Sequence, residues 1–327
     1  MSLPDSVTQE RRPIKPYQTG EGHTDWVNGV IHLPDGQRMI TCSDDGSLGV
    51  WSLQTGKQIQ SWRDGDRGFK VISLSVDGMK IASGGDDGVV RLWDIETGQV
   101  IAKWTGHTKN IEALCWNPNG ERVLSGCRDG GIRVWDVESG NTILEIKTGL
   151  SDVLAAIYSP NTMMIATGGF SSGDERIKIW DANTGRLLAN LRGHTSRVNC
   201  LAWTANGTTL ISGAVDSTIK TWNAFTWRQI VSLTAHTNAV RAIAISPNAR
   251  ILASVSWDKT ARLWSLENGQ LIGSPLRHPD WVICVSFSTD GKLLATGCID
   301  NNTYTWDLAE VIQDAGLDEL LLSPNVS

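Results

Sequence analysis

Histidine, a Ser or Thr hydroxyl and aspartate recur at fixed spacing in this chain, and acid-base catalysis and metal binding use these residue types. An aspartate precedes a tryptophan by six residues in seven places, and a hydroxyl precedes it by ten, or by thirteen in the fourth copy. The tryptophans are Trp51, Trp93, Trp135, Trp180, Trp222, Trp264 and Trp306. The aspartates are Asp45, Asp87, Asp129, Asp174, Asp216, Asp258 and Asp300. The hydroxyl residues are Thr41, Ser83, Ser125, Thr167, Ser212, Ser254 and Thr296. Such repetition indicates a repeated fold rather than one catalytic centre.

Five of the six histidines also follow the repeat, because they stand 28 residues before the tryptophan. They are His23, His107, His194, His236 and His278. Copy two has Gly65 there, and copy four, which is three residues longer, has Gly149 at the corresponding position. An imidazole can donate to the aspartate and accept from the hydroxyl, while the hydroxyl satisfies a buried indole N–H. We therefore interpret the four residues as a hydrogen-bonded structural tetrad. Copies two and four lack the histidine, so we expect these blades to be held together less strongly. The sixth histidine, His32, has no Cys or His at ligand spacing and is expected on the surface.

The remaining composition argues against several function classes. None of the six cysteines forms a CxxC, and Cys200 and Cys284 occupy a repeat position that elsewhere holds small residues, so we expect buried thiols. The formal net charge of −6 gives no reason to expect nucleic-acid binding. No signal peptide or apolar run of membrane-spanning length is present, which predicts a soluble cytoplasmic protein, with a nuclear location as the alternative. No catalytic residue, metal ligand or cofactor is predicted.

The spacing of strand and turn signals predicts one all-β domain. The tryptophans recur every 42 residues, or 45 once, and each copy reads as four strands separated by turns such as 118–120 and 139–140. The GH pairs end at His23, His107 and His194, and the WD pairs begin at Trp93, Trp135, Trp180 and Trp306. With these motifs, the chain resembles the WD40-repeat family over residues 13–308. The resemblance implies a single closed ring of seven blades, each a four-stranded antiparallel sheet.

The two chain ends are expected to close the ring. Seven copies with one strand before His23 suggest that 14–19 forms the outermost strand of the last blade. Residues 1–12 are then a flexible N-terminal arm. Residues 309–327 form a C-terminal tail with a short amphipathic helix interrupted near Gly316.

Functional residues are expected where a copy departs from the repeat, because the common positions already serve the fold. Trp26, Trp257 and Trp281 are aromatic departures in blades one, six and seven, and the resemblance implies that all three lie on the partner-binding face near the central channel. Either they form a binding surface together, or each indole packs on its own loop. The repeat position that Arg241 occupies, at the start of the first strand, holds a different kind of residue in most copies and could bind a peptide selectively. Its residues are Asn28, Lys70, Glu112, Leu154, Asn199, Arg241 and Ile283. Asp44, Asp86 and Glu112 form an acidic sector interrupted by Lys70 and Arg128, which suggests a basic ligand.

The predicted function is a noncatalytic, monomeric scaffold that binds a protein or peptide on this face, without nucleic acid or membrane. The alternatives are an enzyme that uses the channel, the sensor or recognition domain of a larger signalling protein, and a designed or consensus-like repeat domain without its own partner. Weaker departures are the longer 170–176 loop on the same face and the 225–227 turn on the opposite face, which lacks the expected glycine.

Overall fold

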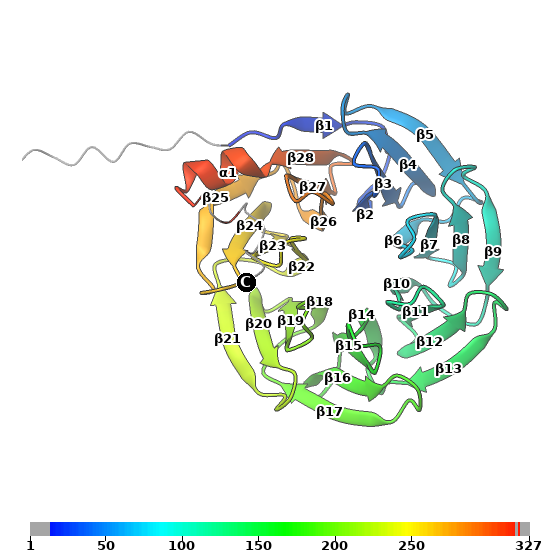
Figure 1. Ribbon diagram of the computed structural model, residues 1–327. Coiled ribbons are helices and arrows are strands. Elements are labelled where there is room, and N and C mark those ends of the chain that lie inside the picture. The colour runs from blue at the N-terminus through cyan, green and yellow to red at the C-terminus, as the bar shows by residue number, and fades with distance from the viewer. Residues whose placement is uncertain (1–13, 318–319, 321–327) are drawn as a thin grey trace, which may run out of the picture.

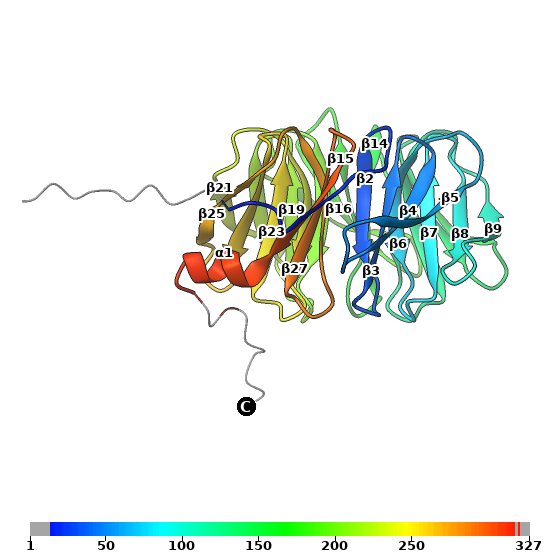
Figure 2. The ribbon, with the colours of Figure 1, turned by 90° about the horizontal axis from the view of Figure 1, so that it is seen from above.

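The computed structural model describes residues 14–317 and 320, which form seven four-stranded antiparallel sheets around a central axis (Figure 1). In each blade the first strand lies next to the axis and the fourth lies at the rim. Figure 2 shows the ring from its edge. The all-β, seven-bladed fold predicted from the sequence is confirmed.

The strands of the first four blades follow the sequence order within each sheet. Blade one consists of β2 (Val27–His32), β3 (Arg38–Ser43), β4 (Ser47–Ser52) and β5 (Gln58–Arg63). Blade two consists of β6 (Phe69–Leu74), β7 (Lys80–Gly85), β8 (Val90–Asp94) and β9 (Val100–Trp104). Blade three consists of β10 (Ile111–Trp116), β11 (Arg122–Cys127), β12 (Gly131–Asp136) and β13 (Thr142–Lys147). Blade four consists of β14 (Asp152–Tyr158), β15 (Met164–Phe170), β16 (Glu175–Asp181) and β17 (Leu187–Arg192).

The last three blades repeat this order until the ring closes. Blade five consists of β18 (Val198–Trp203), β19 (Thr209–Ala214), β20 (Thr218–Asn223) and β21 (Gln229–Thr234). Blade six consists of β22 (Val240–Ile245), β23 (Ile251–Ser256), β24 (Thr260–Ser265) and β25 (Leu271–Arg277). Blade seven consists of β26 (Val282–Phe287), β27 (Leu293–Cys298), β28 (Thr303–Asp307) and β1 (Gln18–Gly20).

The closing strand β1 pairs antiparallel with β28, opposing Gln18 to Thr305, as the closure model predicted. The pairing is shorter than the expected 14–19 segment: the backbone N–H of Tyr17 still donates to Thr305 at 2.7 Å, but regular pairing begins only at Gln18. Pro16 has no N–H to donate, which explains why the ladder does not extend toward residue 14. The first and last parts of the chain thus share one sheet.

Adjacent blades pack through the indoles of the repeat. Trp93 is buried and stacks on Trp62 of the preceding blade, with centroids 6.4 Å apart and planes 20° apart. Trp135 and Trp104 repeat this contact at 5.8 Å and 18°. Each first strand is flanked by two other blades, which accounts for its largely apolar composition.

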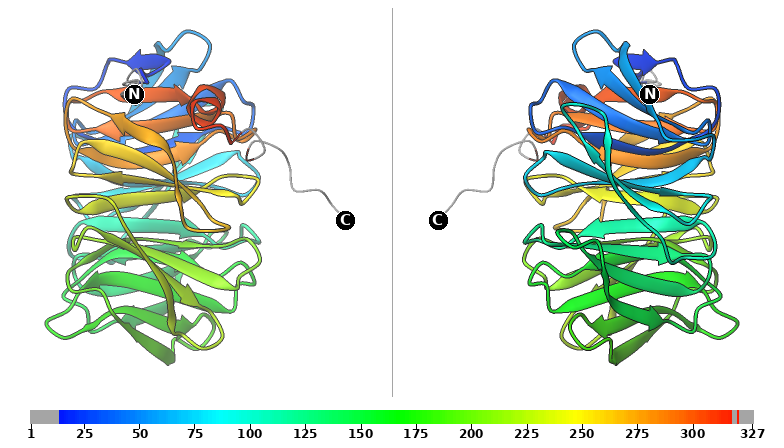
Figure 3. Two further views of the ribbon diagram at one scale, coloured as in Figure 1. Left: turned by 90° about the vertical axis from the view of Figure 1, so that its left-hand side faces the viewer. Right: turned by 90° about the vertical axis from the view of Figure 1, so that its right-hand side faces the viewer.

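A short helix follows the last strand. α1 (Leu308–Asp314) begins at Asp307, whose side chain accepts a hydrogen bond from the Ala309 N–H at 2.8 Å. Val311 and Ile312 are buried against the last blades, and the helix lies at the rim beside β25 and β28 (Figure 3). The predicted arm at 1–12 and the tail residues 318–319 and 321–327 lie outside the described residues. Within the described part of the chain, no helix is long and apolar enough to cross a membrane.

Candidate functional site

The repeated polar residues form buried tetrads in four blades. In blade six, Ser254 Oγ accepts from the Trp264 indole at 2.8 Å and contacts His236 Nε2 at 2.8 Å. His236 Nδ1 lies 2.8 Å from Asp258. Hydrogen bonds from His236 and Thr260 hold the pKa of Asp258 far below its usual range, although burial opposes them. The same contacts occur in blades one, three and five, so these histidines and aspartates are already used by the fold.

Blades two and four lack the histidine and resolve its absence differently. In blade two the Arg91 guanidinium donates to Asp87 at 2.6 Å and to Asp64 at 2.6 Å, so an arginine replaces the imidazole as the partner of the repeat aspartate. In blade four the indole still donates to Thr167 at 2.9 Å, but the side chain of Asp174 is 85% exposed on the longer loop. In blade four the repeat aspartate therefore lies outside the tetrad.

Blade seven has the histidine but not its aspartate contact. His278 Nε2 lies 2.7 Å from Thr296, whereas its Nδ1 contacts the Leu276 carbonyl at 3.1 Å. Asp300 instead accepts a short hydrogen bond from Tyr304. Burial lowers the pKa of His278 to about 4, so this imidazole is neutral near pH 7.

The sequence predicted His32 on the surface, but the structure buries it between blades one and seven, where it is 4% exposed. Its Nδ1 lies 3.3 Å from Ser286, and its Nε2 is buried without a partner among the described residues. Burial lowers its pKa to about 4. The prediction was wrong because the residue ends a first strand, and closure of the ring places blade seven against it.

The thiols and the tetrad groups do not form a reactive centre. Burial raises the pKa of both Cys200 and Cys284 to about 12, so they are protonated. Within the described part of the chain, one group of potential metal ligands has its atoms within 4.8 Å of one another: His107, Cys127 and Asp129. Asp129 already accepts from the backbone N–H groups of Thr108 and Gly131, and burial raises the pKa of Cys127 to about 11. This group fits a tetrad better than a metal site.

A different set of residues surrounds the central channel, one from each blade; we call it the mouth ring. It contains Asn28, Lys70, Glu112, Leu154, Asn199, Arg241 and Ile283, which all line a cavity of about 190 Å³. Each lies at a register shift between the first and second strands of its blade. A β-bulge leaves an extra residue out of the pairing and re-aims its side chain. This local feature explains why seven varied residues can face the axis.

Several charges at the mouth ring are already paired. Lys70 Nζ lies 2.5 Å from Asp44 and 3.7 Å from Asp86. Asn28 also donates to Asp44, at 2.7 Å, and Asp86 accepts from Asn110 at 2.6 Å. Burial nevertheless raises the pKa of Asp44 above its ordinary value. The predicted acidic sector is therefore an internal network.

Glu112 and Arg128 form the next pair of this sector. The Nε of Arg128 donates to Glu112 at 2.6 Å, with 6% of the Glu112 side chain and 47% of the Arg128 side chain exposed. Arg241, by contrast, is partly buried, and its guanidinium forms no hydrogen bond or ion pair with any residue that the structure describes. The charges of the mouth ring are thus not equivalent.

The three predicted tryptophans lie in loops on the same face as the mouth ring, which we call the mouth face. The loop N–H groups of Asp44 and Trp257 donate to the carbonyls of Trp26 and Ala239, so the loops that carry these residues are hydrogen-bonded in pairs. Trp257 and Trp281 are partly buried and stack on each other, with centroids 4.8 Å apart and planes 20° apart. Trp26 is 43% exposed, and no ring contact joins it to this pair in the described part of the chain. The structure brings two of the three indoles together.

The weaker departures pack mainly on their own neighbours. Phe170, in the longer loop of blade four, lies under the Arg197 guanidinium at 5.5 Å. Trp227 adopts a positive φ of 57° where other blades have glycine, and packs edge-on against Trp203 at 6.2 Å. Phe225 in the same turn is 78% exposed.

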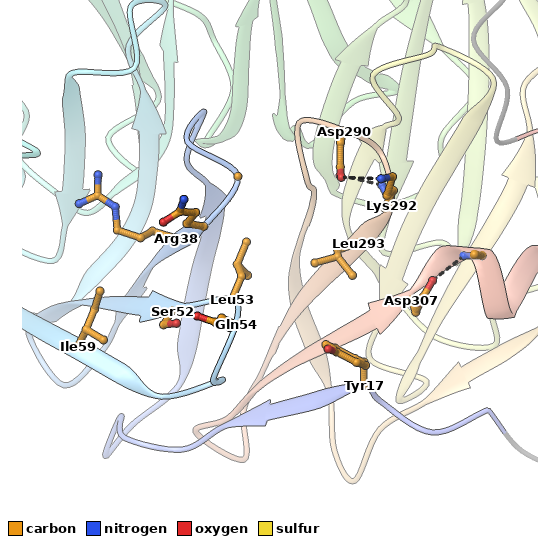
Figure 4. A pocket seen from close by; sticks show the side chains of 13 residues that line it. Tyr17, Arg38, Ser52, Leu53, Gln54, Ile59, Asp290, Lys292, Leu293 and Asp307 are labelled. Carbon is orange, nitrogen blue, oxygen red and sulfur yellow. Dashed lines mark hydrogen bonds and ion pairs between the residues drawn. The ribbon is translucent and has the colours of Figure 1, made fainter.

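The sequence did not indicate one larger groove, which lies on the opposite face. It has a volume of about 880 Å³ and lies where blades seven and one meet, with Tyr17, Leu53 and Lys292 among its lining residues (Figure 4). Because hairpin turns of two blades and the strand from the N-terminus form it together, no local motif could reveal it.

Comparison with known families agrees with this geometry. The model of the WD domain, G-beta repeat, matches residues 14–52, 56–94, 98–136 and 142–181. The model described as the IFT122 first beta-propeller matches residues 170–315. The chain belongs to the WD40-repeat family. WD40 propellers typically serve as protein-interaction scaffolds, and nothing in the described residues of this one indicates catalysis.

Curated relatives match this WD40 propeller over short segments. Lissencephaly-1 homolog 1 of Paramecium tetraurelia is 50% identical over 40 residues, which is 12% of this chain and 10% of that protein. Nuclear distribution protein PAC1 of Eremothecium gossypii is 39% identical over 57 residues, 17% of this chain and 12% of its own. The guanine nucleotide-binding protein subunit beta of Zea mays is 45% identical over 51 residues, 15% of this chain and 13% of its own. Each match thus spans a small part of either protein.

Proposed function

We propose that the protein is a noncatalytic scaffold that binds a protein or peptide on its mouth face. The observation that carries this proposal is the stacked pair of Trp257 and Trp281 beside the mouth ring, with Trp26 exposed on the same face. Large aromatic side chains that remain accessible are enriched at the energetic centres of interfaces. They bury much area for little loss of conformational entropy.

The closed ring supports this function mechanically. The loop with Trp257 joins two paired strands of blade six, and the loops with Trp26 and Trp281 connect neighbouring blades. Buried indoles also pack between blades, as Trp93 does on Trp62. Side chains on such a frame are preorganised, so less ordering entropy opposes binding. The protein therefore needs no rearrangement of its fold to present the site.

The proposed working state is a monomer without a nucleic-acid or membrane partner, in the cytoplasm or the nucleus. Closure by β1 pairs β28 within the same chain, so assembly with a second copy is not required to complete the last sheet. The formal net charge of −6 disfavours contact with phosphate backbones.

The test is an affinity capture with mass spectrometry, comparing the native chain with Trp26→Ala, Trp257→Ala and Trp281→Ala combined. The matched control removes three exposed apolar side chains from the opposite face, Val76→Ala, Met79→Ala and Phe225→Ala. Both variants are used only after their melting temperatures match that of the native chain. Partners lost in the tryptophan variant and kept in the control support the proposal. Partners lost only in the control would move the site to the opposite face.

A further inference from the structure

Arg241 differs from the other cations around the mouth ring. Lys70 has Asp44 as a counter-ion, and Arg128 has Glu112. Arg197, in the loop before blade five, lies 3.4 Å from Asp152. The Arg241 guanidinium has no such partner in the described chain, although it lines the cavity and is partly buried.

The surroundings of Arg241 leave its charge uncompensated. Burial lowers the pKa of Arg241, and the carboxylate that acts most strongly on it is Glu112 across the channel. Glu112 already accepts a hydrogen bond from Arg128, whose positive charge also acts on Arg241. A guanidinium withdrawn from water without a counter-ion is costly, and an anion that enters the cavity would remove this cost.

The backbone places Arg241 beside the stacked indoles. Val240 opposes Ser256 in the pairing of β22 with β23, and the N–H of Trp257 donates to the Ala239 carbonyl at 3.1 Å. Ser256 therefore lies opposite the residue before Arg241, and Trp257 directly follows Ser256. Trp281 of blade seven stacks on Trp257. An apolar surface and an unpaired cation thus adjoin each other at one side of the mouth.

We propose that the mouth ring accepts one anionic side chain of a bound peptide, a carboxylate or a phosphate ester, which pairs with the guanidinium of Arg241. A neighbouring apolar residue of the peptide packs on Trp257 and Trp281. The planar fork of arginine matches both anions with two parallel hydrogen bonds. This inference rests on the proposed function. It favours an anionic ligand over the basic one suggested by the sequence, because the acidic groups of blades one to three are already paired.

The probe is a set of short acetylated peptides with leucine on both sides of a central Asp, Glu, phosphoserine, Asn or Lys, with the remaining positions randomised. Binding is measured by titration of the full chain, followed by tryptophan fluorescence. We expect an acidic centre to bind about tenfold more tightly than Asn, as for a hydrogen bond to a charged group. The Asp and Glu arms against the phosphoserine arm distinguish a carboxylate from a phosphate ester.

Three variants test the role of Arg241. In Arg241→Gln the preference for an acidic centre should disappear, and in Arg241→Lys, which keeps the charge but not the fork, part of it should remain. Arg186→Gln, an exposed arginine on the opposite face, should keep the full preference. If Arg241→Gln does not fold, the native chain is titrated at high salt instead. The preference for an acidic centre should then disappear, while binding of the peptide with a central Asn stays unchanged.

Several outcomes would overturn the inference. An unchanged acidic preference in Arg241→Gln, or a preference for Lys in the native chain, contradicts it directly. Binding that ignores the central charge but is lost in Trp257→Ala with Trp281→Ala would reject the anion site and leave the proposed function intact. If no peptide binds, both the inference and peptide recognition on this face are rejected.

Discussion

The tetrads and the mouth ring are built from the same blades, yet they treat polar side chains in opposite ways. In the tetrads, residue types recur from blade to blade and their buried polar atoms are paired, as in His236, Ser254 and Asp258. In the mouth ring the seven residues differ, and Arg241 has no partner in the described chain. The β-bulges that carry the mouth ring separate its side chains from the ladder, so their identities can vary without changing the fold.

This difference teaches where to look for function in a repeat protein. Positions that every blade shares are constrained by packing and hydrogen bonding, whereas bulge and loop positions on the same scaffold are free to specialise. Substitutions in the tetrads should therefore cost stability and keep ligand preference. Substitutions in the mouth ring should change ligand preference and cost less stability.

The largest expected effect is that of Asp258→Ala in blade six. The Asp258 side chain is 5% exposed and accepts from His236, Thr260 and the Thr237 N–H. Its removal leaves several buried donors unsatisfied, which should lower the free energy of unfolding by about 3 kcal/mol or more. Urea unfolding at pH 7 measures this loss.

Asp174→Ala is the matched control in blade four, because the same repeat position is there 85% exposed. It should change the free energy of unfolding by about 0.5 kcal/mol or less. Equal losses of unfolding free energy in Asp258→Ala and Asp174→Ala would show that the tetrad contacts of Asp258 do not stabilise blade six.

The next effect concerns the pH dependence of stability. The pKa of His32 is lowered to about 4 in the folded chain, below its ordinary value of 6.5, so protonation favours the unfolded chain. The stability that neutral His32 contributes is complete above pH 6.5 and falls as the pH drops toward 4. At pH 5 the loss relative to pH 7.5 should be about 2 kcal/mol for this histidine.

His32→Gln isolates this contribution. Urea unfolding at pH 7.5 and pH 5 should show a difference about 2 kcal/mol smaller than in the native chain. The aspartates of the tetrads, whose pKa values are held far below the usual range, lose their contribution only below the unfolded pKa of about 4. An unchanged pH difference in His32→Gln would mean that the buried imidazole is not neutral, or is not the group that titrates.

A smaller effect on stability than that of Asp258 or His32 is expected in the mouth ring itself. Lys70→Met removes the cation between Asp44 and Asp86 and should cost about 1 kcal/mol, since the pair is partly exposed. It should also make the mouth more negative and weaken binding of the peptides with an acidic centre. A double-mutant cycle with Asp44→Asn measures the coupling, and stability equal to that of the native chain would show that the ion pair is not needed.

Local sequence patterns were sufficient for the fold because each blade is specified by contacts close in the chain. The spacing of Asp258 and Trp264, for example, fits one hairpin, and its sevenfold repetition fits a ring. The pattern also placed Trp26, Trp257 and Trp281 as departures from the repeat. Their joint role in binding stays a prediction.

What the sequence by itself determined is therefore the blade, the number of blades and the strand that closes the ring. Only the tertiary structure decided that His32 is buried, that Trp257 stacks on Trp281, and that Arg241 is the mouth-ring arginine left without a partner. These three facts depend on contacts between blades or on the bulges that aim side chains at the axis. A one-dimensional repeat contains no record of which charges meet across a channel, because that distance is fixed only when the ring closes.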